Sequence, residues 1–229
     1  MGIDHSLTYR EFKLRNIPHL IRLRTLKRLV TENSVDEIDF YADFGCSNGY
    51  LTNIFAEISS PKKSFGFDLS DNIKEAKIKF PYIDFDYIDL NGDFNFSKKF
   101  DLITCFETLE HVGNIRNALE ILKKAANNNS YILISVPIEI GTIGLLKYLV
   151  KRFLLKYELP LLCNDFEYLH ALITQSDISK YRKISDGYGS HFGFDYRYLD
   201  TEINKAFSSW KVDKFNSGST RFYRITIAS

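Results

Sequence analysis

Between residues 38 and 136, short apolar runs alternate with longer segments of helical pattern. The apolar runs end in polar or glycine-rich turns, as the strands of a buried sheet do. Such alternation predicts parallel strands joined by right-handed helical crossovers. We expect strands at residues 38–44, 64–68, 82–89, 100–106 and 131–136, and helices at residues 49–58, 70–80 (with Ser70 as its N-cap) and 114–127.

The two ends of the chain have different patterns. Residues 7–31 are predicted to be helical, with a break near Pro18, because proline lacks an N–H and restricts the residue before it. Residues 199–208 also have a helical pattern. The β-type runs 210–215 and 221–227 flank a turn rich in Asn, Ser and Gly, which predicts an antiparallel hairpin. We expect one domain, 1–229, with an N-terminal helical cap at 1–35.

Residues 138–195 lie between the fifth predicted strand and the last predicted helix and do not belong to the alternating pattern. We expect them to form an insertion on the substrate side. Within it, residues 143–156 are apolar with interspersed Lys and Arg. We favour an amphipathic lid helix that packs on the core. The alternative is peripheral contact with a membrane surface that presents a lipid-linked substrate.

Composition sets only broad limits. The 229 residues are 45% apolar and 26% charged, with a net charge of +1, as in an ordinary globular protein. Three cysteines lack metal-site or paired spacing, and no signal peptide or apolar run of membrane-spanning length is visible, so we expect a cytoplasmic protein. Residues 1–30 hold seven Lys and Arg, which fit a solvated helix face or contact with an anionic partner.

The turn after the first predicted strand carries the most informative motif, Asp43 to Tyr50 (DFGCSNGY). Glycines let a ligand approach the backbone closely, and the helix that follows offers unpaired N–H groups. The spacing is G-x-x-x-G after an acid, whereas a pyrophosphate prefers G-x-G-x-x-G. Because an acid repels phosphate and attracts a cation, a ligand with an ammonium and an adenosine fits this turn better than a dinucleotide.

This motif and those downstream resemble, in order, the Rossmann-like S-adenosylmethionine (SAM) methyltransferases. The resemblance covers residues 41–137 and departs at Ser47, where the family often has glycine. It implies an α/β fold, a three-layer sandwich with a seven-stranded, mostly parallel sheet and an antiparallel terminal hairpin. It also implies that Asp68 binds the ribose of SAM. The cofactor-binding residues expected from it are Asp43, Gly45, Cys46, Asn48, Gly49, Asp68, Leu69, Asp89, Leu90 and Phe106.

The sharpest clue to mechanism is Glu107-x-x-Glu110-His111, after the fourth predicted strand. If Glu107 begins a helical turn, the other two side chains lie on its side, and two carboxylates with an imidazole suit a divalent cation. The pattern resembles the metal site of small-RNA 2′-O-methyltransferases and the equivalent turn of ubiquinone-pathway O-methyltransferases. That resemblance implies His191 as a fourth ligand, and we expect Mg²⁺ or Mn²⁺.

The alternative is a turn without metal, in which His111 acts as the base. Either way, His111 and Glu107 are the expected catalytic residues, because a hydroxyl acceptor needs help to lose its proton. We expect a SAM-dependent methyltransferase that O-methylates a small-molecule or glycan hydroxyl. RNA 2′-O-methylation stays open, although no strongly basic balance supports a nucleic-acid partner. A regulatory subunit that only binds SAM is disfavoured by the retained acids, and an NAD-dependent dehydrogenase by the missing third glycine.

Overall fold

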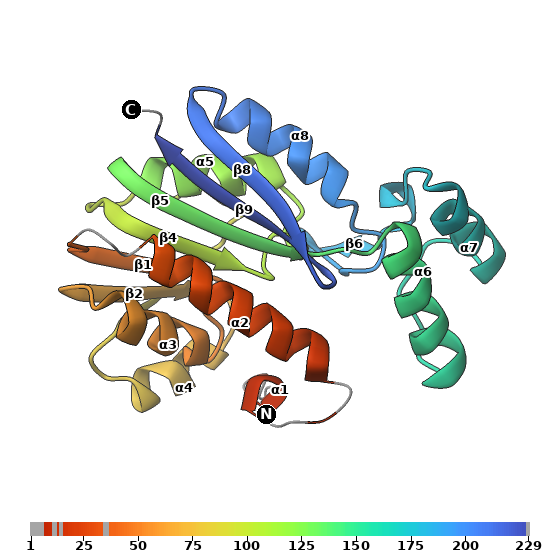
Figure 1. Cartoon of the computed structure of the whole chain (residues 1–229), viewed down its shortest axis with the longest axis horizontal. Helices are drawn as coiled ribbons and strands as arrows, with labels where there is room; N and C mark the ends of the chain where they lie inside the picture. Colours follow the sequence, from red (N-terminus) through yellow and green to blue (C-terminus); the bar gives the residue numbers. More distant parts are fainter. Residues whose placement is uncertain (1–6, 11–12, 14–15, 34–36, 228–229) are drawn as a thin grey trace.

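The computed structural model describes residues 7–10, 13, 16–33 and 37–227. One central sheet runs through the molecule, and helices cover both of its faces (Figure 1). The helices are α1 (Leu7–Arg10), α2 (Ile17–Glu32), α3 (Tyr50–Ser59), α4 (Asn72–Lys79), α5 (Ile115–Ala125), α6 (Gly141–Leu149), α7 (Asp165–Thr174) and α8 (Tyr196–Ala206). The strands are β1 (Phe40–Phe44), β2 (Lys63–Asp68), β3 (Asp84–Tyr87), β4 (Phe100–Phe106), β5 (Ala126–Pro137), β6 (Ile184–Ser185), β7 (Tyr188–Gly189), β8 (Trp210–Ser217) and β9 (Thr220–Ile227).

The seven-stranded sheet has the order β3-β2-β1-β4-β5-β9-β8. Strands β1 to β5 pair in parallel, whereas β9 runs antiparallel between β5 and β8. This is the predicted sheet with its terminal hairpin, so the expected fold class is confirmed. Because the parallel strands point the same way, their carboxyl ends meet at one edge, where open α/β sheets bind ligands.

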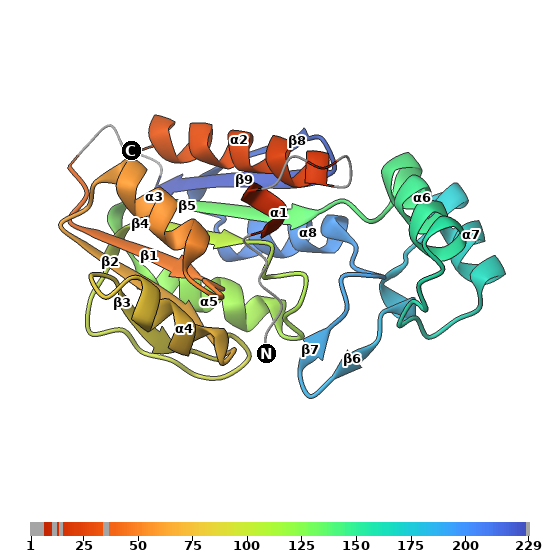
Figure 2. The same cartoon turned by 90° about the horizontal axis from the view of Figure 1, so that it is seen from below.

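Each face of the sheet has its own apolar core. Helices α5 and α8 pack on one face, where α5 buries a full stripe that includes Leu119 and Leu122. The Asn114 side chain caps α5 by accepting a hydrogen bond from the Asn117 N–H at 3.1 Å. Helices α2 and α3 pack on the other face, around residues such as Phe55. Figure 2 shows α2 and α5 on opposite sides of the sheet.

The predicted capping residue of α4 is wrong. The helix begins at Asn72, and Asp71 occupies the N-cap position without a side-chain hydrogen bond. Ser70 lies before it, where its backbone N–H donates to Asp68 Oδ1 at 2.7 Å. The turn that follows β2 is therefore organised by the acid at the end of the strand and not by a serine cap. The predicted break near Pro18 is confirmed, because α2 begins at Ile17 with the proline in its first turn.

The insertion forms a small lobe beyond the end of β5 (Figure 1). It contains α6, a π-helical turn η2 (Val150–Leu154), α7, a short 3₁₀ turn η3 (Ser179–Tyr181) and the hairpin β6–β7. A complete capping box joins Asn164 and Glu167 at the start of α7. The lobe has its own apolar core, centred on Tyr148, Tyr168 and Ile178. Among the described residues, none of the helices has the length and apolar character needed to span a bilayer.

Candidate functional site

A cavity of about 1230 Å³ opens at the carboxyl ends of β1, β2 and β4. Its walls come from the glycine-rich turn, the turn after β4, helix α2 and the insertion. Residues far apart in sequence therefore share one site. Of the ten predicted cofactor-binding residues, eight line this cavity: Asp43, Gly45, Cys46, Asn48, Asp68, Leu69, Leu90 and Phe106. Gly49 and Asp89 do not line it, and both support residues that do.

The two glycines of the turn are required by backbone conformation. Gly45 has φ +83°, and a Cβ placed on it would lie 2.0 Å from Thr108 Oγ1. Gly49 has φ +74° and is the N-cap of α3, while its N–H donates to the Cys46 carbonyl at 2.9 Å. Both positions therefore need glycine. Ser47 also has a positive φ, +48°, a conformation that glycine adopts more readily than serine.

Asp43 is a buried carboxylate at the end of β1. It is 3% exposed, and it accepts hydrogen bonds from Thr52 Oγ1 at 2.6 Å and Thr104 Oγ1 at 2.7 Å. Burial raises the pKa of Asp43 to about 6, although the two threonine hydroxyls oppose that rise. The site thus holds a negative charge at neutral pH that few protein groups neutralise, which suits a cationic ligand.

Asp68 connects the first two strand ends. Its Oδ2 accepts from the Ser47 N–H at 2.7 Å, and its Oδ1 accepts from the Ser70 N–H at the same distance. The carboxylate is half-buried and lines the cavity. Asp68 therefore fixes both turns while its side chain faces the space where a ribose is expected.

Asp89 follows β3 and contacts the insertion. Its Oδ1 accepts from Tyr188 Oη at 2.5 Å and from the Asn91 N–H at 2.7 Å. Burial alone would raise the pKa of Asp89, but these hydrogen bonds lower it overall. Since its partners are protein groups, Asp89 anchors the β6–β7 hairpin beside the cavity.

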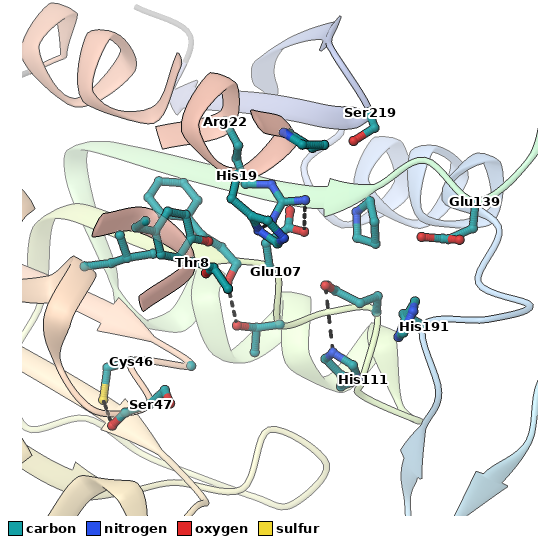
Figure 3. Close-up of a pocket in the computed structure, with 18 of the residues that line it drawn as sticks. Thr8, His19, Arg22, Cys46, Ser47, Glu107, His111, Glu139, His191 and Ser219 are labelled. Atoms are coloured by element: carbon teal, nitrogen blue, oxygen red, sulfur yellow. Dashed lines mark hydrogen bonds and ion pairs between the residues drawn. The ribbon is translucent and has the colours of Figure 1, made fainter. Parts of the chain in front are cut away.

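The turn after β4 differs from the predicted one. Glu107 has φ +53°, so it does not begin a helical turn; the hydrogen-bonded turn starts at Thr108, whose carbonyl accepts from the His111 N–H at 2.9 Å. Glu107 Oε2 pairs with Arg22 Nη2 at 2.8 Å, and its Oε1 accepts from Ser135 Oγ at 2.9 Å. This ion pair joins helix α2 to the edge of the sheet where the parallel strands have their carboxyl ends (Figure 3).

Glu110 is almost fully buried, at 2% exposure. Burial raises the pKa of Glu110 well above its ordinary value, and the negative charge of Glu107 adds to the rise. The raised pKa means that this buried site favours the neutral carboxyl over the carboxylate. Its Oε1 lies 3.9 Å from His111 Nε2.

His111 is held by the hairpin of the insertion. Its Nδ1 lies 3.1 Å from the carbonyl oxygen of Gly189, which can only accept, so Nδ1 carries the hydrogen and Nε2 is the nitrogen that can take up a proton. The backbone adds a second tie, because the Gly189 N–H donates to the His111 carbonyl at 2.8 Å. His111 lines the cavity, and half of its side chain is exposed.

His191 lies beside His111, with ring centroids 6.2 Å apart (Figure 3). Its Nε2 accepts from Lys151 Nζ at 3.0 Å. Burial is the main cause that lowers the pKa of His191 to about 3, and the positive charges of Lys151, of a protonated His111 and of Lys147 contribute to that value. His191 is therefore neutral and bonded to an ammonium group.

The predicted metal site does not form. Across residues 7–10, 13, 16–33 and 37–227, no three His, Cys, Asp or Glu side chains are grouped so that they could hold a metal ion. Of the four predicted ligands, Glu107 pairs with Arg22, and His191 directs its Nε2 at Lys151. A cation would have to displace both positive side chains, so the arrangement does not fit Mg²⁺ or Mn²⁺.

Several lining residues escaped prediction. Arg22 belongs to the basic N-terminal segment, but only the tertiary structure shows which of its cations reaches the site. His19 also lines the cavity, as do Lys147 and Lys151 of the insertion. Tyr188, in the hairpin β6–β7, lines the cavity too. The charge pattern alone had no signal that could have singled these residues out.

Comparisons with known proteins agree with this geometry. Residues 15–164 match the sequence family described as "Methyltransferase domain". No curated protein sequence matches the chain.

Solved structures share the fold at low sequence identity. A SAM-dependent methyltransferase from Clostridium acetobutylicum ATCC 824 superposes with a TM-score of 0.60 at 13% identity, over 90% of this chain and 91% of that one. The methyltransferase domain of bacterial CtHen1 gives 0.61 at 12% identity, over 92% and 100%. Magnesium protoporphyrin IX methyltransferase from Synechocystis PCC 6803, with bound S-adenosylhomocysteine (SAH), gives 0.59 at 13% identity, over 97% and 92%.

The family match covers well over half of the chain, and the predicted cofactor turn lines the cavity of the matching fold. The chain therefore belongs to the methyltransferase-domain family and is a SAM-dependent methyltransferase with a Rossmann-like fold.

Proposed function

We propose that this methyltransferase acts on a hydroxyl group of a small molecule or glycan unit, with His111 as the general base and no metal ion. The observation that carries the proposal is the contact between His111 Nδ1 and the Gly189 carbonyl, which fixes the tautomer. An alcohol must lose a proton as it is methylated, and an imidazole nitrogen that lines the cavity can accept it.

The cofactor half of the cavity supports the proposal. SAM, when bound, supplies the methyl group of its sulfonium. The turn at Gly45 brings backbone close to the ligand, the Asp43 carboxylate offers a negative charge toward a cationic ligand, and Asp68 is placed to accept from ribose hydroxyls. A cavity of about 1230 Å³ leaves room for an acceptor beside the cofactor.

The acceptor half supports alignment and proton transfer. Arg22 holds Glu107, and the buried Glu110 lies beside His111, with its Oε1 3.9 Å from His111 Nε2. When His111 takes the acceptor's proton, the Gly189 carbonyl stabilises the imidazolium through Nδ1. These residues position and deprotonate the acceptor, and the in-line geometry supplies most of the remaining acceleration.

Peripheral contact of residues 143–156 with a membrane belongs to the same proposal. Helix α6 and η2 leave Leu146, Phe153, Leu154 and Leu155 exposed, at 64%, 54%, 75% and 54%. Lys156 is exposed beside them. Exposed apolar side chains with neighbouring cations are typical of surfaces that rest on anionic bilayers. This supports an acceptor that is amphiphilic or presented at a membrane.

The test replaces His111 by glutamine, with His170→Gln as the matched control, because His170 is exposed on α7 and does not line the cavity. SAH release is measured with a panel of phenols, catechols and sugar alcohols, and SAM affinity by calorimetry. We expect kcat to fall by about a hundredfold or more in His111→Gln while SAM affinity is unchanged. Activity within a fewfold of wild type would rule out His111 as the base.

A further inference from the structure

Two lysines enter the acceptor end of the cavity from α6 and η2. Lys147 is neutralised there: its Nζ lies 2.9 Å from Glu139 Oε1 and donates to the Ile138 carbonyl at the same distance. Glu139 is itself buried, at 4% exposure. The Glu139 carboxylate therefore balances the positive charge of Lys147.

Lys151 has a different environment. Its Nζ donates to His191 Nε2 at 3.0 Å and lies 4.5 Å from the centre of the Phe192 ring. None of the ion pairs found among the described residues includes Lys151. Lys151 is half-buried, and burial lowers its pKa; the charge of Lys147 adds to the fall, and the Glu139 carboxylate opposes it. A half-buried cation in direct contact with two neutral residues, His191 and Phe192, thus lines a cavity that must receive an acceptor.

We propose that Lys151, with the neutral His191 as its supporting partner, binds an anionic group of the methyl acceptor, a carboxylate or a phosphate. This inference rests on the proposed function, because it names the class of acceptor whose hydroxyl lies at His111. An anion here gives Lys151 a direct ion-pair partner, since the nearby Glu139 is already paired with Lys147, and the ammonium has two further N–H groups to donate.

The spacing limits the size of the acceptor. His191 contacts Lys151 on one side and lies with its ring centroid 6.2 Å from that of His111 on the other. Because His191 neighbours both residues, one small acceptor can present its anion to Lys151 and its hydroxyl to His111. Ile143, Leu146 and Val150 line the same wall and offer it apolar contact. The class that fits is a hydroxylated, largely apolar ring or short chain that carries one acid group.

The experiment measures binding to the protein saturated with SAH, so that it does not depend on turnover. Three probes share one catechol: 3,4-dihydroxybenzoate, 3,4-dihydroxybenzylphosphonate and the neutral 3,4-dihydroxybenzamide. Calorimetry is run on wild type, Lys151→Gln and the control Lys156→Gln, whose lysine is exposed and does not line the cavity. The carboxylate and the phosphonate distinguish the two anionic groups.

We expect wild type and Lys156→Gln to bind at least one anionic probe about tenfold or more tightly than the amide, and Lys151→Gln to lose that preference. Equal affinity for acid and amide in wild type, a preference that survives in Lys151→Gln, or no saturable binding of either anion at millimolar concentration would overturn the inference. Lys151-dependent binding without methyl transfer would leave the anion site standing and count against the proposed function. Methyl transfer without a preference for the acids would support the proposed function and overturn the anion site.

Discussion

Replacing Asp43 by asparagine should remove a pH-dependent cost of folding. The folded-state pKa of about 6 exceeds the ordinary value of 3.8 because the carboxylate is buried. The folded chain therefore binds more protons than the unfolded chain between these two values, and the free energy of unfolding falls as pH rises through that window. Each pKa unit corresponds to about 1.4 kcal/mol. The free energy of unfolding of the wild type is therefore lower by about 3 kcal/mol at neutral pH than at a pH below both pKa values.

Asparagine suits the test because it keeps the shape and both hydrogen bonds. Its oxygen can accept from Thr104 Oγ1, and its amide can donate to Thr52 Oγ1 once that hydroxyl rotates. Other carboxylates that are distant from Asp43 affect wild type and variant alike, so their contributions cancel in the difference. The stability of Asp43→Asn relative to wild type should therefore increase by about 2.5 kcal/mol between about pH 4 and pH 7, because part of the change has already occurred at pH 4.

Urea unfolding measures this difference. Trp210, the single tryptophan, packs on Phe207 with ring centroids 5.3 Å apart and reports unfolding by fluorescence. Asp93→Asn is the control, since Asp93 is exposed and should show no trend relative to wild type. A relative stability that stays constant across this pH range, or that decreases with pH, would refute the assignment of a raised pKa to Asp43.

Three further results are expected. Asp68→Ala should weaken SAM binding by about 1.5–3 kcal/mol in calorimetry, because charge-assisted hydrogen bonds are lost, and unchanged affinity would remove Asp68 from the cofactor site. Gly45→Ala should lower the melting temperature through its positive φ and its clash with Thr108, and Thr108→Ala should restore only the part due to the clash; full restoration would contradict backbone strain. Phe153→Ser with Leu154→Ser should reduce sedimentation with anionic vesicles severalfold, and sedimentation equal to wild type would count against membrane contact.

Local sequence was sufficient for the framework of the fold. The strand at Phe100–Phe106 and the helix at Ile115–Ala125 were predicted because apolar spacing reports which side of an element is buried. Gly45 and Gly49 were identified by their spacing as positions where a ligand can approach the backbone, and the structure adds a separate reason for glycine, since both have a positive φ. The order of these motifs along the chain then indicated the methyltransferase family, and the family match confirms it.

The chemistry at the catalytic edge depended on contacts between distant segments. Spacing alone made Glu107, Glu110 and His111 look like one helical ligand set, but a positive φ at Glu107 removes the helical turn. Arg22 lies more than eighty positions earlier in the sequence and forms an ion pair with Glu107. A carboxylate that was expected to bind a metal therefore binds a guanidinium group.

In the insertion, too, local sequence did not predict a contact between distant residues. His191 was expected as a metal ligand, yet Lys151, forty positions earlier, is its partner. Sequence predicted the strands of the main sheet, the helices between them and the glycine-rich turn, because each depends on neighbours a few residues apart. Only the tertiary structure decided which charges meet in the cavity, because electrostatic partners are chosen by distance in space, and the long connections of this fold bring them together from four separate segments.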